Sequence, residues 1–154
     1  MAKEIIMVLV RSDNIEDASE AAYEAEEAMK LESGSGCFSP INSTLFMNNI
    51  EIQIISSEEV GIPAFKKRLE QLETERQRII KEVASEFGAN RLDLMFQADE
   101  HDIWRVSEGL RLARGGIGYD CPCWDATNQT SNLKIAIESL SEEESYWLVP
   151  VEID

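Results

Sequence analysis

The stretch from residue 63 to residue 87 constrains the fold most, because its apolar residues recur every three or four positions, as on one face of a helix. Gly61 and Pro63 mark a stop followed by a helix start, and Gly88 is placed to cap the C-terminus. A helix over 63–87 is roughly 37 Å long at 1.5 Å per residue. Because this is long for a chain of 154 residues, a homodimer through helix 63–87 is one hypothesis.

Shorter periodic segments surround this helix. They are a strand at 4–10, a helix over 14–31, a hairpin of strands 44–47 and 50–55, and a strand at 91–96. Together with the long helix they follow the order βαββαβ. This order predicts a ferredoxin-like core over residues 1–97, with an antiparallel sheet and both helices on one face.

Residues 98–154 predict a C-terminal elaboration of this core. Its segments are a helix over 100–114 that Gly115 and Gly116 end, an irregular loop over 115–132, a segment at 131–140, and a closing strand at 146–153. The segment at 131–140 fits both a strand and a helix, and the polar residues before it favour a helix. Pro150 cannot donate to a ladder, so the closing strand should lie at an edge or be bulged there. We therefore expect one α+β domain over 1–154.

The charge balance restricts the partners of the chain. It has 30 acidic and 14 basic residues, which gives a formal net charge of −16. Such a surface repels phosphate backbones and anionic membranes and attracts basic proteins. We therefore expect neither direct nucleic-acid binding nor membrane binding. Three cysteines and no visible secretory signal are typical of a cytoplasmic protein with reduced thiols.

Two segments are candidate partner-binding surfaces. The predicted helix over 14–31 carries one acidic face, formed by Glu16, Glu20, Glu24 and Glu27. The predicted loop over 115–132 carries Tyr119, Trp124 and Asp125, and aromatic residues near a polar rim are typical of interfaces. Long loops in small domains are often functional. The alternative interpretation places these aromatic residues in a small core beneath the loop.

Four residues are candidate metal ligands, and they are Cys37, His101, Cys121 and Cys123. The spacing C-x-C is shorter than the usual pairing in structural zinc sites, so ordinary reduced thiols are the competing interpretation. His101 is the only histidine and lies among acidic residues, without an orienting partner that the sequence identifies. We therefore expect a non-enzymatic interaction protein without a cofactor, and keep a zinc-binding or small-molecule-binding domain as the alternative.

The general make-up of the chain is small, acidic, α+β and poor in cysteine. In this it resembles many small proteins of phages and mobile elements. That group includes inhibitors of host defence systems, some of which imitate DNA with their carboxylates. The resemblance covers no defined motif, and it implies an inhibitor or regulator of a nucleic-acid-binding protein.

Overall fold

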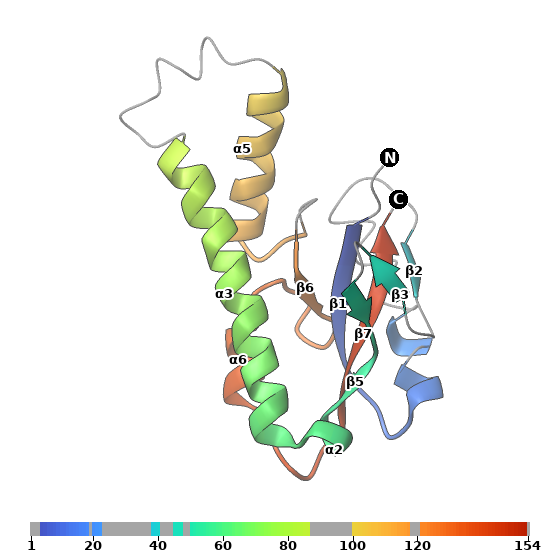
Figure 1. The fold of residues 1–154 in the computed structure, drawn as a ribbon. Coiled ribbons are helices and arrows are strands. Elements are labelled where there is room, and N and C mark those ends of the chain that lie inside the picture. Colours follow the sequence, from blue (N-terminus) through green and yellow to red (C-terminus); the bar gives the residue numbers. More distant parts are fainter. Residues whose placement is uncertain are drawn as a thin grey trace.

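Two eight-residue strands form the centre of the structure. The structure is a computed structural model, and it describes residues 4–18, 20–22, 38–40, 45–47, 50–86, 100–117 and 121–153. β1 (Glu4–Arg11) pairs antiparallel with β7 (Tyr146–Ile153) along its whole length (Figure 1). Both strands are apolar runs, and Ile6, Val8 and Leu148 are fully buried. This is the burial on two faces that a continuous apolar run predicts, so both predicted strands are confirmed.

The sheet is mixed, which corrects the prediction of a purely antiparallel sheet. Its order is β2-β7-β1-β6, and β5 also pairs with β7. The three short strands are β2 (Phe38–Pro40), β5 (Ile55–Ser56) and β6 (Cys123–Asp125). β6 runs parallel to β1, with Val8 opposite Trp124. β6 lies within the stretch that the sequence predicts to be irregular. The sequence does not predict this strand, because three residues are too few to show the two-residue period of a strand. The ferredoxin-like order is not confirmed, and the predicted strand at 91–96 lies outside the described residues.

Pro150 does not mark an edge strand, because β7 has neighbours on both sides. On one side it pairs with β1, where Pro150 lies opposite Met7. On the other side β2 pairs with residues 151–153 and β5 pairs with residues 147–148. Pro150 therefore lies in the gap between β2 and β5, where neither of these short strands pairs with it and no N–H donor is needed. Pro150 is accommodated by this gap, and not by the predicted strand edge or bulge.

Helices pack on both faces of the sheet, and the expected placement on one face is wrong. Successive side chains of a strand point to opposite faces. One core cluster joins Ile6 and Val8 of β1 to Ala18 and Ala22, which belong to the helical residues 15–22 (residue 19 is not described). The other cluster joins Met7 and Leu9 of β1 to Phe65, Leu69, Leu72 and Ala136. The last four belong to α3 (Ile62–Glu86) and α6 (Lys134–Glu138), which confirms the long helix and the helix preferred for 131–140.

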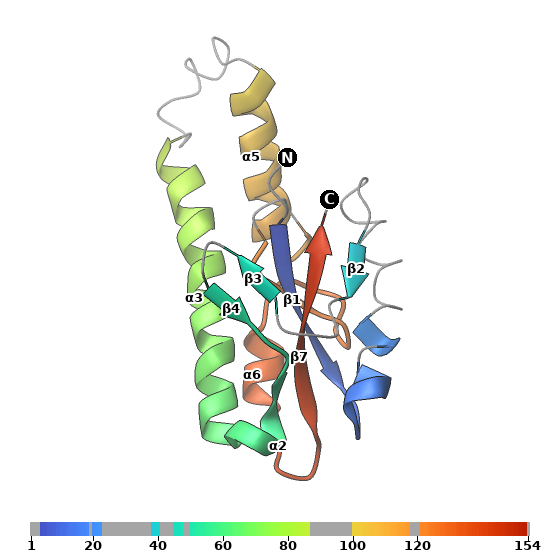
Figure 2. The same cartoon turned by 45° about the vertical axis from the view of Figure 1, so that its right-hand side comes forward.

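α3 and α5 (Glu100–Ala113) lie side by side, and their far ends extend past the sheet (Figures 1 and 2). Gly109 permits this approach, because a Cβ at that position would lie 2.7 Å from the Val83 side chain. Gly115 ends α5 with φ +84°, and the N–H groups of Gly115 and Gly116 bond to the carbonyls of Leu112 and Arg111. The predicted glycine stop is thus confirmed.

A buried arginine joins α3 to the ends of two other helices. Arg76, only 2% exposed, donates to Glu73 Oε1 at 2.7 Å and to the carbonyl of Leu112 at 2.8 Å. Its Nε donates to Ser131 Oγ at 3.3 Å. The other carboxylate oxygen of Glu73 accepts the N–H of Leu133, the residue before α6, at 3.0 Å. Arg76 interrupts the apolar stripe in the sequence because it serves this junction.

The remaining elements are short. β3 (Leu45–Met47) and β4 (Ile50–Ile52) form a separate antiparallel pair, which confirms the predicted hairpin. α2 (Ser57–Val60) follows β5, and the Ser56 side chain caps it. The exposed residues of α3 are mostly polar or charged. Its outer surface therefore offers no apolar stripe to a second copy, and the homodimer stays a prediction.

Candidate functional site

Three separate segments meet at one end of the sheet, where β1 ends and β7 begins (Figure 1). The N–H of Ser12 donates to the carbonyl of Ser145 at 3.1 Å, and the indole N–H of Trp147 donates to the carbonyl of Ser12 at 2.8 Å. The N–H of Tyr146 donates to Ser57 Oγ at 2.9 Å, and the Ser145 hydroxyl donates to the Glu58 carboxylate. These bonds connect three segments at this end, which are residues 11–18 and 20, residues 57–60, and residues 141–145.

The three segments carry nine exposed acidic residues, which are Asp13, Glu16, Asp17, Glu20, Glu58, Glu59, Glu142, Glu143 and Glu144. Among the described residues of these segments the only base is Arg11. Its Nη1 lies 3.3 Å from Glu144 Oε2, and its guanidinium lies 5.6 Å from the centre of the Tyr146 ring. We call this surface the acidic end. In the described part of the chain, the next bases in sequence after Arg11 are Lys66 and Lys67, which lie on α3.

The start of the first helix is positioned by its own cap. The N–H of Asp17 donates to Asn14 Oδ1 at 2.9 Å, and Asn14 Nδ2 donates back to Asp17 Oδ2 at 2.9 Å. Such a reciprocal pair satisfies helix N-terminal donors. Asp13 and Glu16, each one residue earlier in the sequence, do not take part in this cap. Because Asp13 and Glu16 do not form the cap, both carboxylates face solvent.

The predicted partner-binding residues are separated by the fold. Glu16 and Glu20 are exposed at the acidic end, whereas Glu24, Glu27 and Tyr119 lie outside the described residues. The prediction missed Glu58, Glu59 and the run Glu142–Glu144. The run of three glutamates was visible in the sequence, but only the fold, through the bond from Ser12 to Ser145, brings it to the end of the sheet that precedes the first helix.

Trp124 and Asp125 lie in the interior. Trp124 is 1% exposed and belongs to the core cluster of Ile6 and Val8. The buried Asp125 carboxylate accepts the N–H groups of Thr127 and Asn128 at 3.0 and 3.1 Å and the Asn128 side-chain amide at 2.7 Å. Asp125 thus shapes the turn that follows β6. Both side chains are only 1% exposed, so neither forms an exposed partner-binding surface.

The candidate zinc ligands do not form a cluster in the part of the chain that the structure describes. Cys37 lies outside it, and the side chain of His101 in α5 is not described. Cys121 and Cys123 are both buried, but they belong to different core clusters. The Cys121 thiol donates to the carbonyl of Cys123 at 3.1 Å. Burial raises the pKa of Cys123 well above its usual value, and the nearby Cys121 and Asp125 raise it further.

We expect both buried thiols to be unreactive in the folded protein. A raised pKa keeps Cys123 protonated at neutral pH, and burial excludes the reagent. In a Cys37→Ser variant, which removes the third thiol, an aromatic disulfide reagent at pH 8 should react at least ~100-fold more slowly with native protein than with urea-unfolded protein. Equal rates in the two states would contradict the buried placement.

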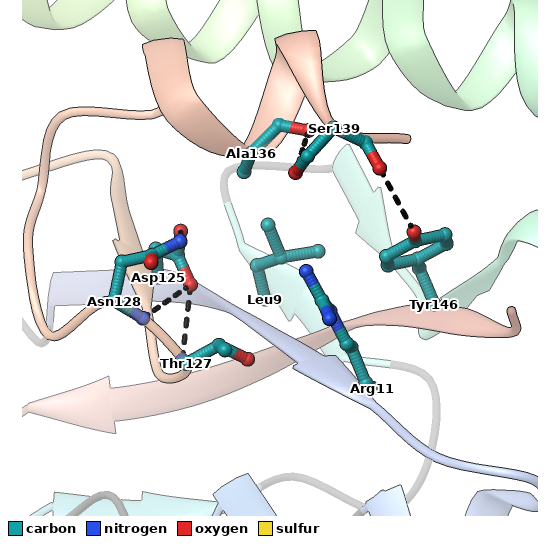
Figure 3. Close-up of a pocket in the computed structure, with 8 residues that line it drawn as sticks. All are labelled: Leu9, Arg11, Asp125, Thr127, Asn128, Ala136, Ser139 and Tyr146. Carbon is teal, nitrogen blue, oxygen red and sulfur yellow. Dashed lines mark hydrogen bonds between the residues drawn. The ribbon is translucent and has the colours of Figure 1, made fainter. Parts of the chain in front are cut away.

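A small depression lies next to the acidic end, where the parallel strands β1 and β6 end (Figure 3). Arg11 points into it, between the turn after β6 and the Tyr146 ring. Ala136 of α6 and Ser139, the residue after that helix, line its other side. Its cavity volume is only about 10 Å³, which is room for about one water molecule and far below the usual volume of small-molecule sites. Burial and the bond to Glu144 raise the pKa of Tyr146.

Comparisons with known proteins place the chain in no group. No protein-family model, curated protein or solved structure matches it. Among the described residues no helix has the length and apolar character to cross a membrane.

Proposed function

We propose that this chain is a non-enzymatic interaction protein that binds a basic surface of a protein partner through its acidic end. The observation that carries the proposal is the convergence of nine exposed carboxylates from three segments against a single arginine. Such a concentration of one sign of charge steers a partner of opposite sign and raises its association rate.

The acidic end is already ordered in the unbound chain. The bonds from Ser12 to Ser145, from Trp147 to Ser12 and from Tyr146 to Ser57 fix the three segments relative to one another. A surface that is already ordered loses less entropy on binding than a flexible acidic tail does. An ordered acidic surface therefore supports the proposal of partner binding better than a flexible acidic tail would.

A nucleic-acid-binding protein is the partner class that this chemistry suits. Such proteins present lysine and arginine where phosphates bind, and an ordered set of carboxylates can occupy the same positions. The chain would then act as an inhibitor or regulator, of the kind found among small acidic proteins of phages and mobile elements. We place this function in a reducing compartment such as the cytoplasm.

Charge reversal tests the proposal, once a partner is isolated by affinity capture from the source organism. The Glu16→Lys/Glu20→Lys variant should slow association at least about tenfold at low salt, with a smaller change in dissociation. The matched control, Glu70→Lys/Glu75→Lys, has the same net charge but changes exposed residues of α3. Equal rates for the two variants, or binding that is insensitive to salt, would overturn the proposal.

A further inference from the structure

α5 carries an apolar stripe that the structure leaves largely exposed. In the sequence, apolar residues of α5 recur at spacings of three, four and three, and they are Ile103, Val106, Leu110 and Ala113. This is the spacing of the a and d positions of heptads, which form a buried seam between paired helices. In the structure, however, Leu110 is 52% exposed, Ala113 is exposed and Val106 is only half-buried. We call these four positions the α5 seam.

A different face of α5 contacts the rest of the molecule. The Val83 side chain of α3 lies against Gly109, and Leu112 is 2% exposed in the core. Arg105 pairs with Glu82 of α3 at 3.3 Å. Residues 105, 109 and 112 recur at spacings of four and three, so they form one helix face, which is not that of the α5 seam. The described part of the chain therefore leaves most of the seam without cover.

We propose that the α5 seam is a homodimer interface, on which α5 of a second copy packs antiparallel. Charge complementarity supports this occupant. With residues 103 and 110 as a positions, the flanking e positions are Glu100, Ser107 and Arg114. An antiparallel pair brings position 100 of each copy close to position 114 of the other, so opposite charges meet twice. A parallel pair would instead bring the two acidic first turns together and the two basic last turns together, which is unfavourable.

The arrangement of the molecule favours the same orientation. The N-terminal end of α5 extends past the sheet, whereas its C-terminal end lies near the sheet (Figures 1 and 2). Antiparallel packing therefore places the two sheets at opposite ends of the dimer, where they do not collide. The acidic end lies at the end of the sheet away from α5 (Figure 2), so each copy keeps it available to a partner. The dimer thus does not depend on the function proposed for the acidic end.

The net charge of the chain does not oppose contact at this surface. Residues 61–114, which include α3 and α5, contain 10 acidic and 10 basic residues, so the formal charge of −16 comes entirely from the rest of the chain. The two copies therefore meet through the part of the sequence that carries no net charge. The two acidic ends, where like charges repel, lie far from the contact.

Sedimentation equilibrium of the full chain tests for the dimer. α5 has 14 residues and is roughly 21 Å long. One such helix per copy makes an interface smaller than the standard size of about 1,600 Å², so we expect a reversible dimer with a dissociation constant of about 10–100 µM. The chain should be monomeric at about 1 µM and mostly dimeric at about 500 µM.

Leu110→Glu locates the interface. A carboxylate in the middle of the seam should raise the dissociation constant at least about tenfold, because the charge loses its water in the dimer. Ile135→Glu is the matched control, since Ile135 is 58% exposed on α6 and the substitution adds the same charge outside the seam. It should change the dissociation constant less than about twofold. Thermal melting should confirm that both variants fold.

Charge exchange tests the antiparallel orientation. Glu100→Lys sets a lysine close to Arg114 of the second copy, and Arg114→Glu sets a glutamate close to Glu100 of the second copy. Each variant alone should therefore dimerise about fivefold more weakly than the wild type. In an equal mixture opposite charges meet again at both places, so a heterodimer should form with about wild-type affinity. Labelling one variant with a fluorophore identifies the heterodimer in sedimentation.

Three results would overturn the proposal. If the chain stays monomeric at about 500 µM, the seam is not a homodimer interface, and a partner of different sequence becomes its occupant. Equal weakening by Leu110→Glu and Ile135→Glu would place the contact elsewhere. If the mixture of Glu100→Lys with Arg114→Glu dimerises no better than either variant alone, the two helices do not pack antiparallel.

Discussion

Replacing Arg76 by alanine is expected to lower the free energy of unfolding by about 3–5 kcal/mol. The guanidinium bonds to Glu73, to the carbonyl of Leu112 and to Ser131, and it is 2% exposed. Its removal leaves a mostly buried carboxylate without its cation and a buried carbonyl without its donor. Urea denaturation monitored by tryptophan fluorescence measures the change directly.

Arg78 on the same helix provides the control. It pairs with Glu75 at 2.6 Å and with Glu82 at 2.7 Å, but the three side chains are about half exposed. Exposed ion pairs contribute little, so Arg78→Ala should leave the urea midpoint close to that of the wild type. Similar midpoints for Arg76→Ala and Arg78→Ala would show that the buried junction does not hold α3, α5 and α6 together.

Trp124→Ala is expected to cost about 3–5 kcal/mol of stability, since truncation of a buried tryptophan leaves a large cavity. Trp124 is 1% exposed and packs with side chains of β1, β7 and α5. Trp124→Phe should have a much smaller effect, within about 1 kcal/mol. The reason is that the indole N–H is buried and has no hydrogen-bond partner in the described structure, so its loss offsets the lost volume.

Calorimetry of the three proteins tests this ordering. We expect Trp124→Phe to melt at nearly the same temperature as the wild type, and Trp124→Ala to melt at a much lower temperature than both. Should Trp124→Ala melt with the wild type and lose partner binding, Trp124 would be the surface residue that the sequence suggested, and the buried placement would be contradicted.

Long periodic segments could be predicted from the sequence, because their signal is repeated many times. Helix 62–86 offers its apolar stripe over seven turns, and β1 and β7 are continuous apolar runs. β6 could not be predicted, since it has three residues and is defined only by its parallel pairing with β1. That pairing changes an antiparallel sheet into a mixed one.

The candidate site shows the same division. Glu16 and Glu20 follow from helical periodicity, which depends on neighbours in sequence. Glu58 and Glu144 join them only because Tyr146 bonds to Ser57 and Ser145 bonds to Ser12, contacts across more than 85 residues. The prediction for Trp124 and Asp125 was wrong, because an aromatic residue beside an acidic one is typical of an interface. In the structure both residues belong to the buried strand β6, and the Asp125 carboxylate stabilises the turn that follows.

The most direct test of the central claim is an NMR titration of the isotope-labelled chain with an oligolysine peptide. We expect saturable changes in amide chemical shift that are concentrated in residues 12–20, 57–60 and 141–146. The amide shifts along Glu70–Glu82 of α3 should change little. The absence of saturation, or the largest shifts on α3, would contradict the claim that the acidic end binds the partner.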